Sequence, residues 1–196
     1  HGTGAAVNGS WRMGAGACLA WAPQEAILFY RGRVARKINI DLAETATLLL
    51  SEIVVFGRTA MEEALTQGSF TDRWRMRRGG KLVFAETVRL GGNIASALGK
   101  SAIAKGGAAV GTALIVPGNE AIVERIRKRQ DSFAGEVGVS CWSGFAMARF
   151  CAQDAAAVRA DMMAVLLQAD IAPLPRVWLQ ESIQSYEKIM RKRASL

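Results

Sequence analysis

Residues 69–90 read SFTDRWRMRRGGKLVFAETVRL, and this stretch decides the fold. Apolar and basic side chains alternate in its first half, so that Phe70, Trp74 and Met76 share one face and Arg73, Arg75 and Arg77 share the other. An alternation with a period of two is typical of a β-strand with one buried face. Gly79 and Gly80 form a tight-turn signal, and an apolar run follows at residues 81–90. The stretch is therefore predicted to be a β-hairpin.

Outward from this hairpin, the same patterns predict a β-dominated α+β fold of layered or β-helical sheets, with about two packed helices in the C-terminal half. Further strands are expected at residues 17–21, 26–30, 34–42, 47–56, 113–116, 136–142 and 145–151. The Gly- and Ala-rich residues 91–111 predict a loop with one helical turn. Helices are expected at residues 119–129, after the capping residue Asn119, and at residues 154–168.

The composition narrows the function classes. The chain has 196 residues, 51% of them hydrophobic, which is enough for one domain with a real core. It has three cysteines and a single histidine, His1, so a histidine-dependent catalytic triad or a Cys/His zinc site is hard to assemble. The apolar runs are shorter than the roughly 18 residues that cross a bilayer, and a secretory leader is not expected from the pattern. We therefore expect a cytoplasmic protein with no membrane segment.

Two glutamates stand at the centre of apolar strand faces. Glu52 shares its face with Leu48, Leu50, Val54 and Phe56, and Glu86 shares its face with Leu82, Phe84, Val88 and Leu90. A buried carboxylate costs several kcal/mol unless it has a partner, a proton or water. Each of the two is therefore expected to have a specific environment.

Two interpretations of these carboxylates are open. In the structural one, Glu52 and Glu86 form ion pairs, with Arg58 or Arg89 as partners, or lie on a solvated strand face. In the functional one, they line a polar passage inside a β-rich body, where hard oxygen ligands suit a divalent ion. Two carboxylates without histidine would bind such an ion weakly, which suits transit better than storage.

The formal charge of +8 raises the question of an anionic partner. Basic residues cluster on one face of residues 73–77, around residues 31–37 (Arg31, Arg33, Arg36 and Lys37), at residues 125–129 and at residues 191–193. The face with Arg73, Arg75 and Arg77 is either a docking surface for an acidic partner or an ordinary solvated face. A nucleic-acid interface would need aromatics among these charges, but Trp74 is predicted to point to the opposite face. A phosphate-binding loop at residues 91–101 lacks its first glycine, because Ile94 stands there.

Several segments together resemble the UreD/UreH family of urease accessory proteins. They are residues 20–29 (AWAPQEAILF), 56–63 (FGRTAMEE), 72–75 (DRWR), 79–86 (GGKLVFAE) and 174–178 (LPRVW). They occur in the family's order and at its approximate spacing. On this basis residues 1–179 are expected to form a family domain whose amino-terminal part is missing, and residues 180–196 a polar, helical tail. The missing part would remove some of the family's sheet.

The resemblance implies a non-catalytic protein with partners and a cargo. It implies binding to UreF, UreG and apo-urease, with a dimer within that complex also allowed, and a transient route for nickel through an internal tunnel. Glu52 and Glu86 fall where the family has acidic residues tied to that route, and Glu25 and Glu63 also match motif positions. The alternatives are a plain interaction module or an inactive fragment, and then a nucleotide- or nucleic-acid-binding protein.

Overall fold

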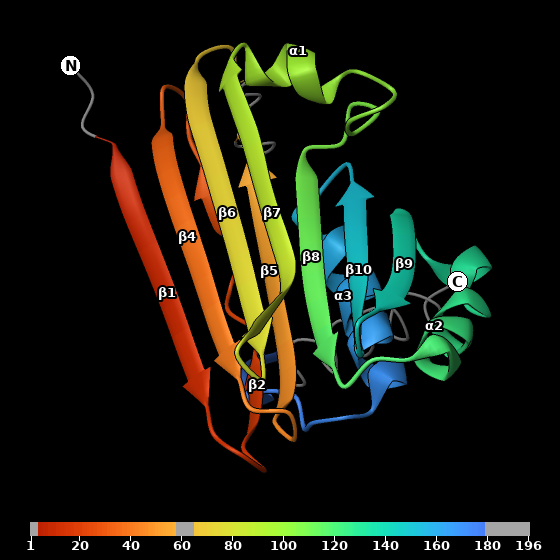
Figure 1. Ribbon diagram of the computed structural model, residues 1–196. Helices are drawn as coiled ribbons and strands as arrows, with labels where there is room; N and C mark the ends of the chain where they lie inside the picture. Colours follow the sequence, from red (N-terminus) through yellow and green to blue (C-terminus); the bar gives the residue numbers. More distant parts are fainter. Residues whose placement is uncertain (1–3, 58–64, 179–196) are drawn as a thin grey trace.

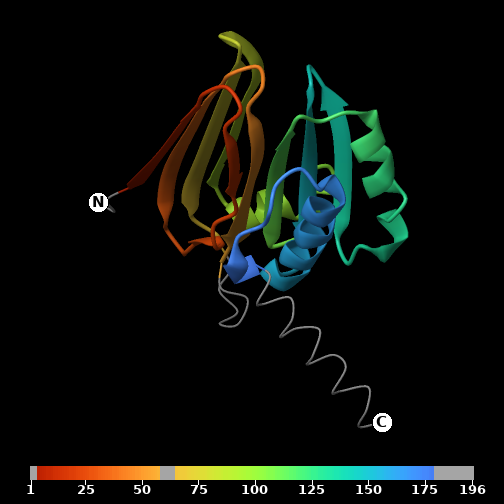
Figure 2. The ribbon, with the colours of Figure 1, turned by 90° about the horizontal axis from the view of Figure 1, so that it is seen from below.

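Two β-sheets lie face to face, and two helices cover the outer side of one of them (Figures 1 and 2). The computed structural model describes residues 4–57 and 65–178. Sheet A has the strand order β1 (Ala5–Met13), β4 (Arg33–Leu42), β6 (Gly68–Arg78) and β7 (Lys81–Gly92). Sheet B has the order β2 (Cys18–Trp21), β5 (Thr47–Phe56), β8 (Ala109–Val116), β10 (Phe145–Ala152) and β9 (Glu136–Trp142), and β3 (Ala26–Leu28) also pairs with β5.

The first half of the chain winds back and forth between the two sheets. β1, β4 and β6 belong to sheet A, and β2, β3 and β5, which lie between them in sequence, belong to sheet B. Parallel strands need a long crossover connection, and here each crossover is itself a strand of the other sheet. As a result β1, β4 and β6 pair in parallel, as do β2 and β3 with β5. The later strands pair in antiparallel fashion: β6 with β7 and β9 with β10 form hairpins, and β8 pairs with β5 and β10.

Helices α2 (Glu120–Arg127) and α3 (Ala155–Ala169) pack on the outer side of sheet B (Figure 2). Asn119 and Asp154 cap them by accepting a hydrogen bond from a backbone N–H of the first turn. The buried face of α3 contains Val158, Met162, Val165 and Leu166, as its periodicity predicts. A short helix, α1 (Ile94–Leu98), follows β7, and a 3₁₀ turn (Gln130–Ser132) follows α2. None of the described helices is long and apolar enough to span a membrane.

The space between the sheets holds two apolar clusters. One cluster is built around Trp74, Met76, Leu114 and Phe145, and the other around Phe56, Phe70, Ile94 and Leu98. Charged side chains from both sheets lie between them. This layer holds the candidate site.

The structure confirms the β-dominated α+β class, the layered sheets and the two packed helices. Both predicted hairpin turns are present, at Gly79–Gly80 and at Ser143–Gly144, with positive φ at all four residues. Two predictions need correction. Residues 5–13, which have no strong strand pattern, form β1 because they pair with β4, and β8 begins at Ala109 rather than at residue 113. The predicted tail at residues 180–196 lies outside the described residues.

Candidate functional site

The charged layer between the sheets consists of Arg36, Glu52, Asp72, Glu86 and Arg149. Arg36 is its most connected member. Its Nη1 donates to Glu52 Oε2 at 2.6 Å, and its Nε and Nη2 donate to the two oxygens of Asp72 at 2.9 and 2.6 Å. Since Arg36 and Asp72 belong to sheet A and Glu52 to sheet B, one guanidinium ties the two sheets together.

A second ion pair runs between the sheets in the opposite sense. Arg149, on β10 of sheet B, donates through Nη2 to Glu86, on β7 of sheet A. Its Nη1 donates to Thr112 Oγ1 at 2.8 Å. Each sheet therefore supplies one arginine and receives one from the other sheet. This pair is more exposed than the first, because about a third of each of its side chains is open to solvent.

The strand registers explain why these residues meet. Arg36 is the register partner of Asp72 in sheet A, while Glu52 pairs with Thr112 and Thr112 with Arg149 in sheet B. Each of them lies on a strand face that is otherwise apolar, and adjacent strands bring the polar positions to the same height. A polar row in each sheet thus faces a polar row in the other.

Burial decides the electrostatics of the first pair. The side chains of Arg36 and Glu52 are 8% and 11% exposed. Burial raises the pKa of Glu52, and the negative charge of Asp72 adds to this effect. Together they outweigh Arg36 and a side-chain hydrogen bond with Trp21, which both lower that pKa. Burial alone would lower the pKa of Arg36, but the hydrogen bonds and charges of Asp72 and Glu52 outweigh it and raise that pKa. Arg36 therefore stays charged, and Glu52 is the group whose ionisation is costly.

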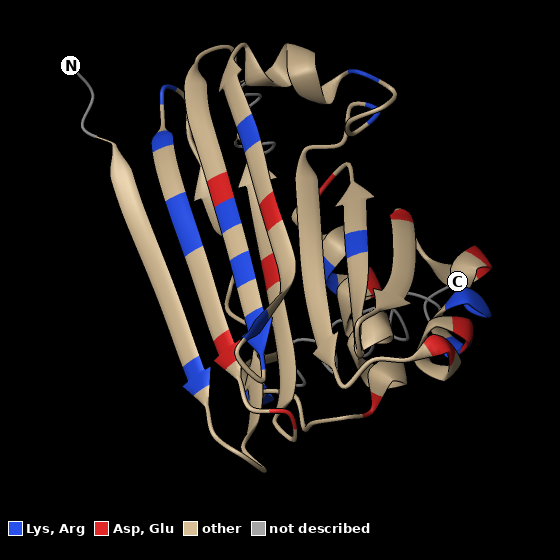
Figure 3. Cartoon of the chain, viewed as in Figure 1, with Lys and Arg blue, Asp and Glu red and all other residues tan. Residues whose placement is uncertain are grey.

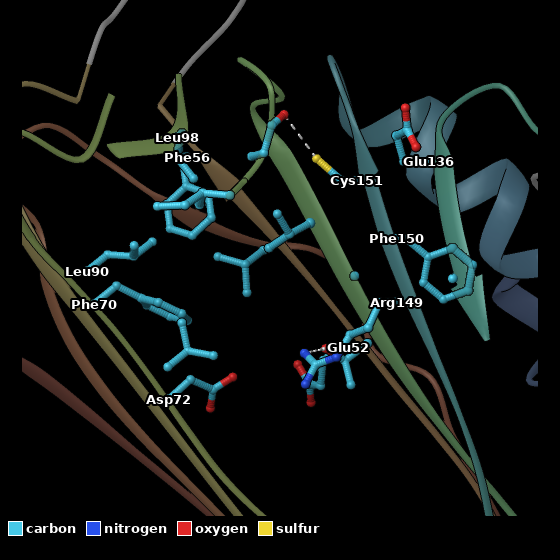
Figure 4. A pocket seen from close by; sticks show the side chains of 18 of the residues that line it. Glu52, Phe56, Phe70, Asp72, Leu90, Leu98, Glu136, Arg149, Phe150 and Cys151 are labelled. Carbon is cyan, nitrogen blue, oxygen red and sulfur yellow. Dashed lines mark hydrogen bonds between the residues drawn. The ribbon is translucent and has the colours of Figure 1, made fainter. Parts of the chain in front are cut away.

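A cavity of about 470 Å³ opens beside the charged layer (Figure 4). Arg36, Glu52, Asp72 and Arg149 line its polar end. Its walls are mainly apolar and include Val54, Phe56, Phe70, Val88, Leu90 and Leu98. The site thus combines fixed charges with walls that hold little water.

The two predicted glutamates have different positions relative to this cavity. Glu52 lines it, whereas Glu86 reaches it through its ion pair with Arg149. Of the two arginines expected to form ion pairs with these glutamates, Arg89 was wrong and Arg58 is not tested. Arg89 cannot reach Glu86, because three residues along a strand place it on the opposite, exposed face, and Arg58 lies outside the described residues. The actual partners are Arg36 and Arg149.

Sequence reasoning missed the role of Arg36 by grouping it with its exposed neighbours Arg33 and Lys37. The signal was available, because Arg36 shares a strand face with Ile38, Ile40 and Leu42. By the same alternation Asp72 lies on the face of Phe70 and Trp74. Trp74 Nε1 also donates to Asp72 Oδ2 at 2.8 Å, which holds that carboxylate in place.

The chemistry of the layer does not favour tight metal storage. Within residues 4–57 and 65–178, no three His, Cys, Asp or Glu side chains are grouped so that they could hold a metal ion. The carboxylates of Glu52 and Asp72 converge on one guanidinium, so an incoming cation would have to replace Arg36 as their counter-ion. A cation at this position would therefore compete with a guanidinium that is already buried between the two carboxylates.

A second polar cluster fixes the end of the described chain. Arg159, on α3, donates through Nε to Glu25 Oε1 at 2.5 Å and through Nη2 to Gln24 Oε1 at 2.6 Å. The guanidinium lies over the ring of Trp178, 4.7 Å from the centroid, and Trp178 Nε1 donates to the carbonyl of Ala22 at 2.7 Å. Glu25, which matches a motif position, therefore has a structural role: its contact with Arg159 anchors the loop before β3 to α3. Glu63 lies outside the described residues.

The three cysteines are free thiols. Cys141 and Cys151 are half-buried and pack against apolar clusters, as expected of small core residues. A hydrogen bond to Glu120 raises the pKa of Cys141, and burial raises that of Cys151. Neither thiol is thereby activated as a nucleophile.

Comparison with known proteins gives a consistent result. Residues 1–179 match the family model described as UreD urease accessory protein. The chain is 66% identical over 178 residues to the "Urease accessory protein UreD" of Bradyrhizobium diazoefficiens, which covers 91% of this chain and 64% of that protein. It is 67% identical over 165 residues to the protein of the same name from Rhodopseudomonas palustris strain BisB18, covering 84% of this chain and 60% of that protein. The chain thus spans somewhat less than two thirds of the length of these relatives.

Proposed function

Because the chain belongs to the UreD family of urease accessory proteins, we propose that it acts in urease maturation as a non-catalytic scaffold. In this proposal it works in the cytoplasm, links apo-urease to UreF and UreG, and offers a transient route for nickel on its way to urease. Nickel is the cargo and not a resident cofactor. The residues assigned to the route are Glu52 and Glu86.

The observation that carries the proposal is the position of Glu52. This glutamate lies between two sheets, at the polar end of a cavity with apolar walls, and its pKa is raised by burial. A divalent cation that entered the cavity would supply the positive charge that a buried carboxylate needs. Carboxylate oxygens are modest ligands for nickel, so the ion could leave again.

Glu86 would extend the route across the charged layer. Glu86 forms an ion pair with Arg149, which lines the same cavity. The side chain of Glu86 is more exposed than that of Glu52. Exchange of a guanidinium for a cation costs less where water can still solvate the displaced group. We therefore assign the more open end of the layer to Glu86 and the more closed end to Glu52.

Urease activation in cells tests the proposed function. Cells that lack their own UreD would be supplied with this protein, and urease activity would be measured with and without added nickel. The same extracts would be examined for co-purification with UreF and UreG. We expect activation together with complex formation. Absence of activation despite a folded, soluble protein would contradict the proposed function.

A further inference from the structure

The outer face of sheet A is strongly basic. We call it the basic face, and it consists of the outward-pointing residues of β1, β4, β6 and β7. Its charged members are Arg12, Arg33, Lys37, Arg73, Arg75, Arg77, Arg89 and the single acidic residue found there among the described strands, Asp41. Small neutral residues such as Ala35, Asn39, Thr71 and Thr87 lie between them. The face is therefore flat as well as basic.

No helix or loop among the described residues packs on this face. Helices α2 and α3 pack on sheet B, on the far side of the molecule (Figure 2). Figure 3 shows where basic residues occur along β4, β6 and β7. Lys37, Arg73 and Arg89 are all exposed; Lys37 is the register partner of Arg73, and Arg89, opposite Thr71, is the diagonal neighbour of Arg73 on β7.

The arrangement carries an electrostatic cost. Lys37 and Arg73 are direct register partners on β4 and β6, and like charges in that relation repel. Within the part of the chain that the structure describes, no carboxylate forms an ion pair with Arg33, Lys37, Arg73 or Arg89. Five other arginines of the described chain do form ion pairs with carboxylates, namely Arg36, Arg78, Arg127, Arg149 and Arg159. An anion from another molecule would relieve the repulsion.

The spacing of the charges favours an acidic helix. Alternate residues of β6, such as Arg73, Arg75 and Arg77, recur about every 7 Å along the strand. Carboxylates four residues apart on a helix recur about every 6 Å. A helix lying along β6 could therefore place successive glutamates or aspartates opposite successive arginines.

We propose that the basic face is a docking surface for an acidic helix of a partner protein. The contact is electrostatic: the helix lies along β6 over Arg73, and Lys37 and Arg89 flank it on the neighbouring strands β4 and β7. It sets the orientation and the association rate of the complex more than its final affinity. The basic face would give the scaffold a specific surface for a partner. Docking there does not depend on the proposed nickel route through Glu52.

A nucleic acid fits the face less well. Single-stranded binding uses exposed aromatic side chains on which bases stack. The described aromatics of sheet A, which are Trp11, Phe70, Trp74 and Phe84, lie on the side that faces sheet B. The basic face thus offers charge without a stacking platform, which suits carboxylates of a protein.

Peptide binding tests the proposal. The probe is an alanine-rich helical peptide with glutamate at every fourth position, and the matched probe has glutamine there. The whole protein would be compared with the variant Lys37→Gln/Arg73→Gln/Arg89→Gln by fluorescence anisotropy. The control variant, Lys100→Gln/Lys128→Gln/Arg129→Gln, removes the same charge from exposed residues outside the face.

We expect the glutamate peptide to bind and the face variant to weaken binding by about tenfold or more. The control variant should bind as the wild type does. The difference should shrink between about 0.1 M and about 1 M salt, because the screening length falls from about 10 Å to about 3 Å. Removal of like charges should leave the face variant at least as stable as the wild type in urea, which separates lost binding from unfolding.

Equal binding of both peptides, or equal binding by the face and control variants, would overturn the proposal. So would tighter binding of a DNA duplex that the face variant alone loses, since the partner would then be a nucleic acid. The variant Glu52→Gln/Glu86→Gln should bind the glutamate peptide normally. A failure of the nickel route and a failure of this docking surface are therefore distinguishable.

Discussion

Arg36 Nη1 lies 2.6 Å from Glu52 Oε2, and this contact joins the two sheets at the centre of the molecule. The same guanidinium holds Asp72 with two further hydrogen bonds. One positive charge therefore serves two buried carboxylates. When both carboxylates are ionised, the layer carries excess negative charge at this point, and this supports the proposed interaction with a cation.

Loss of Arg36 should be strongly destabilising. The variant Arg36→Met keeps an unbranched apolar stem but removes the guanidinium, which leaves Glu52 and Asp72 without their counter-ion. Removal of one partner from a buried ion pair costs about 3–5 kcal/mol, because the remaining charge is buried and unpaired. We expect a loss of this size in the free energy of unfolding in urea at neutral pH.

The matched control for Arg36 is its neighbour Arg33, which is exposed on the same strand. Arg33→Met should change the free energy of unfolding by no more than about 0.5 kcal/mol. Similar effects of the two substitutions would mean that the charged layer is not a buried ion network.

The stability contribution of Glu52 should depend on pH with a definite sign. Because the pKa of Glu52 is raised in the folded protein, its favourable contribution is full below the unfolded pKa and is lost as pH rises through the folded pKa. The free energy of unfolding of the wild type minus that of Glu52→Gln should therefore fall as the pH rises above the unfolded pKa of about 4.3. Urea titrations at several pH values would measure it. A difference that rises with pH would show that Arg36 dominates over burial.

Glu25 should behave in the opposite way. Burial tends to raise its pKa, but the hydrogen bond and charge of Arg159 outweigh burial and the pKa is lowered. The stabilisation is present above the unfolded pKa and is lost as pH falls through the folded pKa. We expect Glu25→Gln to lower the free energy of unfolding by about 1 kcal/mol at neutral pH. The loss should diminish below about pH 4, and a loss independent of pH would contradict the ion pair with Arg159.

The reactivity of Cys141 should depend on Glu120. The thiol donates to Glu120 Oε2 at 3.1 Å, and this hydrogen bond raises the pKa of Cys141. Since the thiolate is the reactive form, Glu120→Gln should speed the reaction of Cys141 with a disulfide reagent at mildly alkaline pH. The rate would be followed in a protein with Cys18→Ser and Cys151→Ser. An unchanged rate would mean that the hydrogen bond does not form in solution.

The face to which each strand residue points could be predicted from the sequence. Period-two alternation fixed Glu52 and Glu86 on inward faces and Arg73 on an outward one, and the structure agrees. Residues 5–13 were missed, because Asn8, Gly9 and Ser10 have low strand propensity and parallel pairing with β4 overrides it.

The partners of the two glutamates could not be predicted from local patterns. Arg36 meets Glu52 because consecutive strands alternate between sheets, and Arg149 meets Glu86 across 63 positions of sequence. Such contacts depend on the register of several strands at once. A local pattern can say that a buried carboxylate needs a counter-ion, but the topology decides which arginine supplies it.

The nickel content of urease tests the central claim most directly. Urease would be purified from cells that lack their own UreD and carry the wild type, Glu52→Gln/Glu86→Gln or the control Glu44→Gln/Glu120→Gln, in which two exposed glutamates are changed. Co-purification with UreF and UreG would be scored in parallel. If the charged layer carries nickel, the Glu52/Glu86 variant assembles like the wild type but leaves urease poor in nickel, while the control loads it fully. If the Glu52/Glu86 variant loads urease as well as the wild type does, the two glutamates are structural and the route through the charged layer is contradicted.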